Sequence, residues 1–128
     1  MIAHLALQNM NMFDQIDGVE KLPDDFKLVV YTSYRSLDDT VCLELCEGLR
    51  DMNKKLGINN FELVVRLSNR GDARWDKSFI LQEIAKYKPD QIKKMWVCGP
   101  PVMNENFDKT LSNLVKEKVL NQSQFEVF

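Results

Sequence analysis

The chain has 128 residues, of which 45% are hydrophobic and 28% charged, and its formal net charge at pH 7 is -2. This composition is typical of one globular domain with a substantial core. No apolar run approaches the roughly 20 residues of a membrane-spanning helix, and the start has neither the basic nor the apolar region of a signal peptide. Because Lys and Arg do not cluster, the sequence also argues against a nucleic-acid or anionic-membrane surface.

The cysteine and histidine content narrows the class further. Three cysteines, an odd number without an export signal, indicate free thiols in a reducing intracellular compartment, on the cytoplasmic or organelle matrix side. A single histidine and the absence of a Cys-x-x-Cys pair argue against a metal site. We therefore expect a protein without a structural or catalytic metal.

The first half of the chain begins with a predicted helix. Apolar residues recur at helical spacing over residues 1–16, and Gly18 is a plausible stop. A polar stretch containing Pro23 predicts a loop. Residues 26–32 are β-branched, aromatic and apolar, which predicts a strand.

A second predicted helix follows that strand. Asp38, Asp39 or Thr40 is expected to cap it, and Gly57 to end it. One apolar face is expected to be buried, and its members are Val41, Leu45, Leu49, Met52 and Leu56.

The second half of the chain alternates in the same way. A strand, a polar loop, a helix, a strand, a longer helix and a final strand are predicted over residues 61–67, 68–76, 78–87, 95–98, 104–119 and 125–128. Strands that alternate with helices predict an α/β fold, namely a three-layer, doubly wound, mostly parallel sheet. No linker or repeat interrupts residues 1–128, so we expect one domain.

The stretch from Met95 to Met103 is expected to lie at a ligand site. It passes from a strand, apolar on both faces, through Gly99, Pro100 and Pro101 into a helix. Glycine permits close approach of a ligand or backbone, and the prolines stiffen the turn. Ligands of open α/β sheets bind beyond the carboxyl ends of the strands, where Cys98 would lie. A cysteine there is commonly a small core residue; the Gly-Pro-Pro sequel favours a functional position.

Three stretches carry a resemblance to a known family. They are residues 96–103 (Trp-Val-Cys-Gly-Pro-Pro-Val-Met), residues 67–70 (Leu-Ser-Asn-Arg) with Trp75 and Asp76, and residues 125–128 (Phe-Glu-Val-Phe). In order and spacing they resemble the NAD(P)-binding, Rossmann-like domain of the ferredoxin-NADP reductase superfamily, in its nitrate reductase, ferric reductase and NADPH oxidase branches. The likeness covers about residues 26–128.

The resemblance implies a role for each matching residue of the Cys-Gly-Pro-Pro-x-Met signature. Cys98 matches the cysteine beside the nicotinamide and flavin rings. Gly99, Pro100, Pro101 and Met103 match the turn over which the dinucleotide passes.

Other matching residues lie elsewhere in the chain. Ser68 and Arg70 match residues that contact the 2′-phosphate of NADP, a role that suits a guanidinium. Ser33 and Arg35 occupy a similar rim position, and Phe128 resembles a terminal aromatic residue near the flavin. The alternative for Arg70 is an ordinary solvated loop arginine.

The chain also departs from the family pattern. It has no Gly-x-Gly-x-x-Pro type loop for a pyrophosphate, and the central first strand that precedes this loop is missing. Either residues 1–7 form that strand, or another chain supplies the strand and the loop. The flavin-binding barrel of the family is absent as well, so FAD would be held by a partner domain or chain.

Two functions follow from these observations. The first is the NAD(P)H-binding portion of a flavin-dependent oxidoreductase, with NADPH favoured over NADH and little activity as an isolated chain. The second is a redox-inactive structural or interaction subunit that keeps the fold without a complete dinucleotide site.

Overall fold

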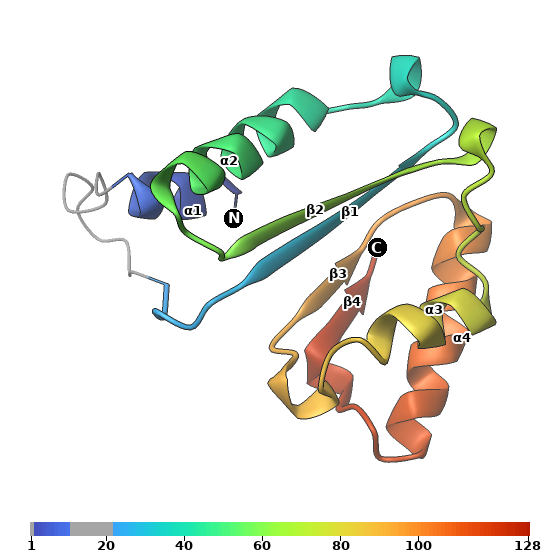
Figure 1. Cartoon of the computed structure of the whole chain (residues 1–128). Coiled ribbons are helices and arrows are strands. Elements are labelled where there is room, and N and C mark those ends of the chain that lie inside the picture. The colour runs from blue at the N-terminus through green and yellow to red at the C-terminus, as the bar shows by residue number, and fades with distance from the viewer. Residues whose placement is uncertain (1, 11–21) are drawn as a thin grey trace. The chain divides into compact units, whose positions relative to one another are not determined.

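The computed structural model describes residues 2–10 and 22–128, and the chain divides into two compact units, Met1–Asp72 and Ala73–Phe128 (Figure 1). Each unit contains a pair of parallel strands and two helices among its described residues. The α/β class and the parallel pairing predicted from the sequence are therefore confirmed.

The first unit is built from four elements, namely α1 (Ile2–Asn9), β1 (Leu28–Tyr34), α2 (Leu43–Leu56) and β2 (Phe61–Leu67). β1 and β2 pair over their full length, from Leu28 opposite Phe61 to Tyr34 opposite Leu67. Figure 1 shows α1 and α2 on the same face of this sheet. Leu5, Cys46, Leu49 and Phe61 form the buried centre between the helices and the strands.

The structure of the first residues decides one of the two alternatives for the missing central strand. The prediction of a helix there is confirmed for Ile2–Asn9, whereas residues 11–21, including Gly18, lie outside the described residues. The alternative that residues 1–7 form a central strand is wrong. The apolar residues of α1 recur every three to four positions, so a helix brings them onto one face. Leu5 lies on that face and is fully buried in the core.

The strand predicted over residues 26–32 begins and ends two residues later, as β1. The reason is local, because the N–H of Phe26 donates to the carbonyl of Pro23 at 3.0 Å and closes a turn. β2 has the predicted bounds.

The capping prediction for α2 is wrong. The helix begins at Leu43, and the residue before it, Cys42, has a left-handed backbone (φ 59°) and makes no side-chain cap. The expected capping residues instead belong to a 3₁₀ turn over Leu37–Asp39, where Thr40 Oγ1 donates to the carbonyl of Leu37 at 2.8 Å. Their side chains are used before the helix starts. Gly57 ends α2 as predicted, with φ 68°.

The buried face of α2 also differs from the prediction. Val41, Leu45 and Leu56 are at least half exposed, and Leu49 is the predicted residue that is buried. The face that packs inward consists of Leu43, Cys46, Leu49 and Asn53. The face of α2 that meets the core is thus shifted around the helix from the predicted one, and it includes the small residue Cys46 and the polar residue Asn53.

Three asparagines explain how a polar residue is buried there. Asn9 Nδ2 donates to Asn53 Oδ1 (2.8 Å) and Asn60 Oδ1 (2.9 Å), Asn53 Nδ2 donates to Asn60 Oδ1 (2.8 Å), and Asn60 Nδ2 donates to Asn9 Oδ1 (2.9 Å). The three amides join the end of α1, the last turns of α2 and the residue before β2. Buried polar groups with satisfied hydrogen bonds specify one arrangement of the elements around them.

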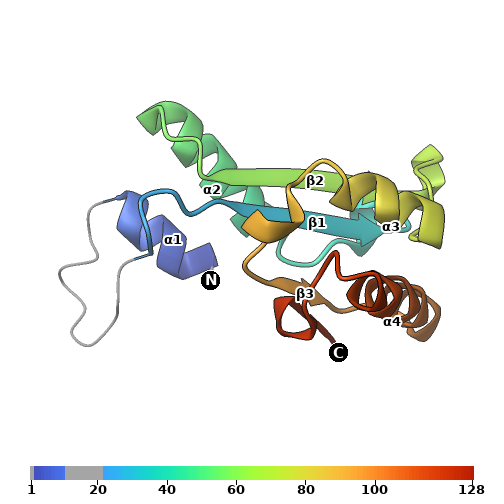
Figure 2. The same cartoon turned by 90° about the horizontal axis from the view of Figure 1, so that it is seen from below.

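The second unit contains α3 (Lys77–Ile84), β3 (Met95–Val97), α4 (Pro101–Lys116) and β4 (Phe125–Val127). Figures 1 and 2 both show α3 beside α4. The core lies between these helices and one face of the short sheet, and its buried members are Ile80, Val97, Phe107, Leu111, Leu114, Leu120 and Phe125. Asp76 caps α3 by accepting from the N–H of Phe79 at 2.8 Å.

Two predictions for this unit need correction. β3 ends at Val97, so Cys98 follows the strand, and Trp96 is 51% exposed, so the strand is not covered on both faces. Helix α4 begins three residues earlier than predicted, at Pro101. Proline is tolerated at the first helical position because the N–H that it lacks would have no intrahelical partner there.

Replacement of Asn53 tests the asparagine cluster. Asn53→Ala leaves the amides of Asn9 and Asn60 partly unpaired, so we expect the free energy of unfolding to fall by about 1–3 kcal/mol. Urea unfolding followed by circular dichroism measures the change. Asn59→Ala, at an exposed neighbouring position, is the matched control and should have little effect; equal effects would contradict a role for the cluster.

Candidate functional site

The predicted site residues fall into two groups, one in each unit. Ser33, Arg35, Ser68 and Arg70 lie at the carboxyl ends of β1 and β2. Residues 98–103 and Phe128 lie at the carboxyl ends of β3 and β4. Each group is brought together within its own unit.

The turn after β3, residues 98–101, is called the Gly99 turn. A Cβ atom at Gly99 would lie 2.3 Å from Met103 Cε and 2.8 Å from Met103 Sδ, which is far closer than atoms can approach. The Met103 thioether thus packs against the backbone of Gly99, and a larger residue there would displace the end of this flexible side chain. Met103 is half-buried beside the core, so it shapes the turn from the inside.

Asn104 ties this turn to the end of β4. Its Nδ2 donates to the carbonyl of Gly99 at 3.0 Å and also to the backbone oxygen of Phe128. The N–H of Phe128 in turn donates to the carbonyl of Val97 at 2.9 Å. The sequence analysis missed Asn104; an amide side chain in the first turn of a helix that starts with proline was the available signal.

Cys98 and Phe128 directly follow the paired residues Val97 and Val127 at the ends of β3 and β4. Met95, Val97, Phe125 and Val127 pack toward the helices, and alternation along each strand places the intervening residues on the other face. Cys98 is exposed and Phe128 is 67% exposed. An exposed thiol and an exposed aromatic ring thus follow the two strands of the short sheet.

The start of α4 offers few hydrogen-bond donors. Pro100 and Pro101 have no N–H, and the N–H of Asn104 donates to the carbonyl of Pro100 at 3.0 Å. Only the N–H groups of Val102 and Met103 remain at a position where helices commonly bind phosphate. This end of the helix suits a neutral ligand group better than a pyrophosphate.

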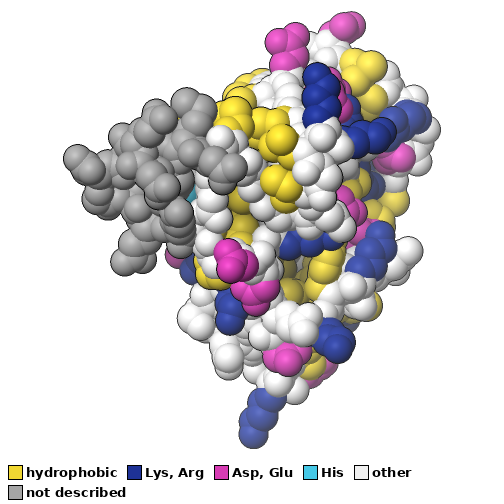
Figure 3. All heavy atoms as spheres, turned by 60° about the vertical axis from the view of Figure 1, so that its left-hand side comes forward, with side chains coloured by type: hydrophobic (Ala, Val, Ile, Leu, Met, Phe, Trp, Pro, Cys, Tyr) yellow, Lys and Arg dark blue, Asp and Glu magenta, His cyan; other side chains and the backbone are white. Residues whose placement is uncertain are grey.

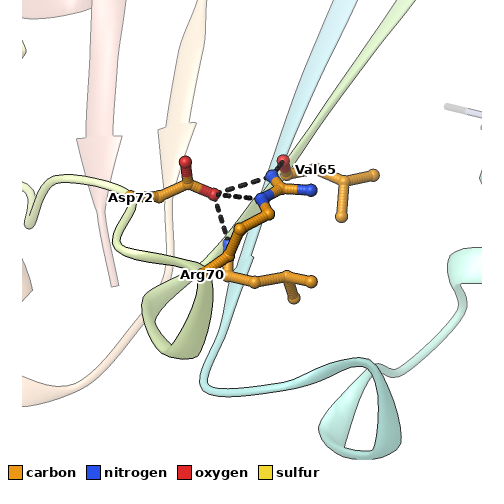
Figure 4. Close-up of polar contacts among 4 residues, drawn as sticks. Val65, Arg70 and Asp72 are labelled. Carbon is orange, nitrogen blue, oxygen red and sulfur yellow. Dashed lines mark hydrogen bonds and ion pairs between the residues drawn. The ribbon is translucent and has the colours of Figure 1, made fainter.

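The loop after β2, residues 68–72, is organised by Asp72 (Figure 4). Asp72 Oδ2 accepts from the N–H of Leu67 at 2.8 Å and from Arg70 Nη2 and Nε at 2.7 and 3.2 Å. Arg70 Nη2 also donates to the carbonyl of Val65 at 2.8 Å. These hydrogen bonds of Arg70 therefore involve Nε and Nη2, on one side of the guanidinium.

Asp72 is a residue that the sequence analysis missed. The sequence signal for Asp72 was an acidic residue two positions after Arg70, with a glycine between them. In the structure Gly71 has a left-handed backbone (φ 88°) that turns the chain back. The loop is also fixed to the end of β1, because the N–H of Asn69 donates to the carbonyl of Arg35 at 2.9 Å. Arg35, Ser33, Ser68 and Arg70 are all exposed at this rim.

The three cysteines form no disulfide. Burial, followed by the neighbouring Cys42 and Glu47, raises the pKa of the Cys46 thiol, so it stays neutral in the core. Cys42 and Cys98 are exposed. A hollow of about 360 Å³ beside Cys42, lined by residues 40 and 42–45, contains none of the predicted site residues.

The charged side chains are mixed in sign. On the face shown in Figure 3, outside the grey residues, Lys and Arg lie among Asp and Glu and do not gather into one patch. This distribution accords with the sequence, in which 17 basic residues stand against 19 acidic ones.

Comparisons with known proteins give no relative. No family model matches the chain, and neither a curated protein nor a solved structure matches it. Within residues 2–10 and 22–128, none of the helices has the length and apolar character needed to cross a membrane.

The pH dependence of the loop over residues 68–72 tests the role of Asp72. The Leu67 N–H and then the Arg70 guanidinium hold the pKa of the Asp72 carboxyl below its ordinary value of 3.8. A lowered pKa means that the carboxylate stabilises the folded loop above pH 3.8 and that this contribution is lost as the pH falls through the lowered pKa. We expect the Leu67 amide resonance in NMR to titrate with a midpoint below 3.8.

The control for this titration is Asp72→Asn. In that variant the acidic transition of the Leu67 amide should disappear while its neighbours keep their chemical shifts. A midpoint at or above 3.8 in the wild type would contradict the assigned contacts.

Proposed function

We propose that the chain is the NAD(P)H-binding portion of a flavin-dependent oxidoreductase, which presents the nicotinamide to a flavin held by another domain or chain. The observation that carries the proposal is the Gly99 turn, with its exposed Cys98 thiol, its glycine and its two prolines at the end of a parallel strand. The resemblance to the ferredoxin-NADP reductase superfamily rests on the same residues. The proposal includes a single Rossmann-like, three-layer sheet as the complete fold.

Hydride transfer would need orientation more than acid–base chemistry from this chain. The flavin, when bound in the partner, accepts the hydride. Cys98 would contact the nicotinamide edge and Phe128 would cover the neighbouring ring face, while the stiff prolines keep the turn in place. These residues contribute position and exclusion of water.

Arg70 supports NADPH as the proposed nucleotide, with NADH as the alternative. Asp72 and the carbonyl of Val65 hold one side of the guanidinium, so the side chain loses little further entropy when Nη1 binds a 2′-phosphate. Ser68, exposed two residues earlier, would add a hydroxyl donor.

A second candidate is a redox-inactive subunit of a larger assembly. Its supporting observation is the difference in charge between the paired strands. β1 has no charged residue, whereas β2 contains Glu62 and Arg66. Edge strands are commonly protected by charges, so an uncharged strand is typical of a sheet interior. A partner chain that pairs with β1 could supply the missing strand, and the Gly-rich loop if the site is active.

Nucleotide titration separates the two candidates. The oxidoreductase proposal expects saturable binding of NADPH, by the chain alone or by the complex that co-purifies with it, together with flavin absorbance in that complex. If neither preparation binds NADPH or NADH at millimolar concentration, the redox proposal fails and the structural one stands.

Arg70→Ala tests the choice of nucleotide. Loss of a charge-assisted contact to the 2′-phosphate should weaken NADPH binding about tenfold or more and leave NADH binding unchanged. Calorimetric titration measures both constants. Arg50→Ala is the matched control, because Arg50 is also an exposed arginine paired with an adjacent aspartate, at 3.3 Å from Asp51. Equal effects on NADPH and NADH would refute the assignment of Arg70.

A further inference from the structure

We propose that Asn104 is a positioning residue that sets the place of the Cys98 thiol in the nicotinamide site by fastening the Gly99 turn to Phe128. The inference rests on the proposed function for its ligand. The geometry that supports it is independent of any ligand.

The bridge made by Asn104 spans segments that are distant in sequence. Its Nδ2 donates to the carbonyl of Gly99, five residues before it, and to the backbone oxygen of Phe128, 24 residues after it. Both N–H groups of one amide are thus used to hold two main-chain oxygens near each other. The carbonyl of Val97, in the peptide group that precedes Cys98, accepts from the N–H of Phe128, and the carbonyl of Gly99, one residue after Cys98, accepts from Asn104, so the backbone is held on both sides of the Cys98–Gly99 peptide.

The orientation of the amide follows from its acceptors. Asn104 Oδ1 is buried and has no hydrogen-bond partner among the described residues. A reversed amide would point this oxygen at two carbonyl oxygens, which is repulsive. An unpaired buried oxygen is costly, and the site tolerates it because the nitrogen makes two bonds.

Helix stability alone does not explain this side chain. Capping residues satisfy N–H groups of their own helix, whereas Asn104 donates to oxygens that lie outside α4. Gly99 is held from its other side by the Met103 thioether. Asn104 bonds the carbonyl of Gly99, the adjacent Met103 packs against the Cα of the same glycine, and Cys98 precedes it directly.

The consequence is a coupling between two site residues. Phe128 and Cys98 are both exposed, and the Asn104 bridge links the backbone of Phe128 to Gly99, the residue after Cys98. Loss of the bridge should affect ligand groups that contact Cys98 and Phe128, while ligand groups bound elsewhere keep their affinity.

The test compares Asn104→Ala with Asn106→Ala in the full chain. Asn106 is a matched control two residues along α4, because its Nδ2 also donates to a backbone oxygen, that of Trp75, at 3.0 Å. The first measurement is alkylation by iodoacetamide, resolved by peptide mass spectrometry, with the exposed Cys42 as internal reference. We expect the ratio of Cys98 to Cys42 alkylation rates to change about tenfold in Asn104→Ala and to stay constant in Asn106→Ala.

The second measurement uses two ligands that share the 2′-phosphate end. NADPH contains the nicotinamide, and 2′-phospho-ADP-ribose lacks it. Asn104→Ala should weaken NADPH about tenfold and leave 2′-phospho-ADP-ribose unchanged. An equal loss for both ligands would show a general structural role and overturn the inference. Asn104→Asp, which keeps the side-chain volume, repeats both measurements if the alanine variant does not fold.

The outcomes also distinguish this inference from the proposed function. If neither the wild-type chain nor the complex that co-purifies with it binds NADPH or NADH, the proposed function fails, and the thiol ratio alone decides whether Asn104 positions Cys98. If the wild type binds both ligands and Asn104→Ala changes neither the thiol ratio nor NADPH affinity, the proposed function stands and the role of Asn104 is refuted.

Discussion

Parallel strand pairing is the constraint on which the rest of the structure depends. Two parallel neighbours cannot be joined by a tight turn, so the chain must leave each strand, form a helix and return to the same end of the sheet. In each unit this requirement gathers the loops that follow the strands at one edge. The Gly99 turn and the loop of Arg70 are placed by that geometry, and side-chain contacts then give each of them its shape.

Local patterns in the sequence predicted most elements, because they depend on neighbours along the chain. The bounds of β2 and the stop of α2 at Gly57 needed only a short run of apolar and β-branched residues and a glycine. The buried face of α2 could not be predicted in this way. Asn53 faces inward because its amide meets Asn9 and Asn60, which are 44 and 7 residues away in the sequence. Such long-range polar pairs leave no trace in hydrophobic periodicity.

The candidate site shows the same difference between features that depend on local sequence and contacts between residues that are distant in the sequence. Cys98 and Gly99 were singled out from residue type at the end of a strand, and Arg70 from the resemblance to a family. The contacts that hold them were not found, because Asn104 and Asp72 act through main-chain oxygens and amides that any residue could supply. A sequence identifies the groups that could meet a ligand more readily than the groups that hold them in place.

The prolines at the start of α4 separate two properties that the N-terminus of a helix normally combines, namely a partial positive charge and free N–H donors. The peptide dipoles of sixteen residues still sum along the axis, so the first turn carries a partial positive charge. Pro100 and Pro101 lack two of the N–H donors through which a helix end usually binds a ligand, and those of Val102 and Met103 remain. The result is an electrostatic field with few directional bonds, which favours an electron-rich neutral group without fixing its angle. Orientation at this end of the helix must then come from packing against Gly99 and its neighbours.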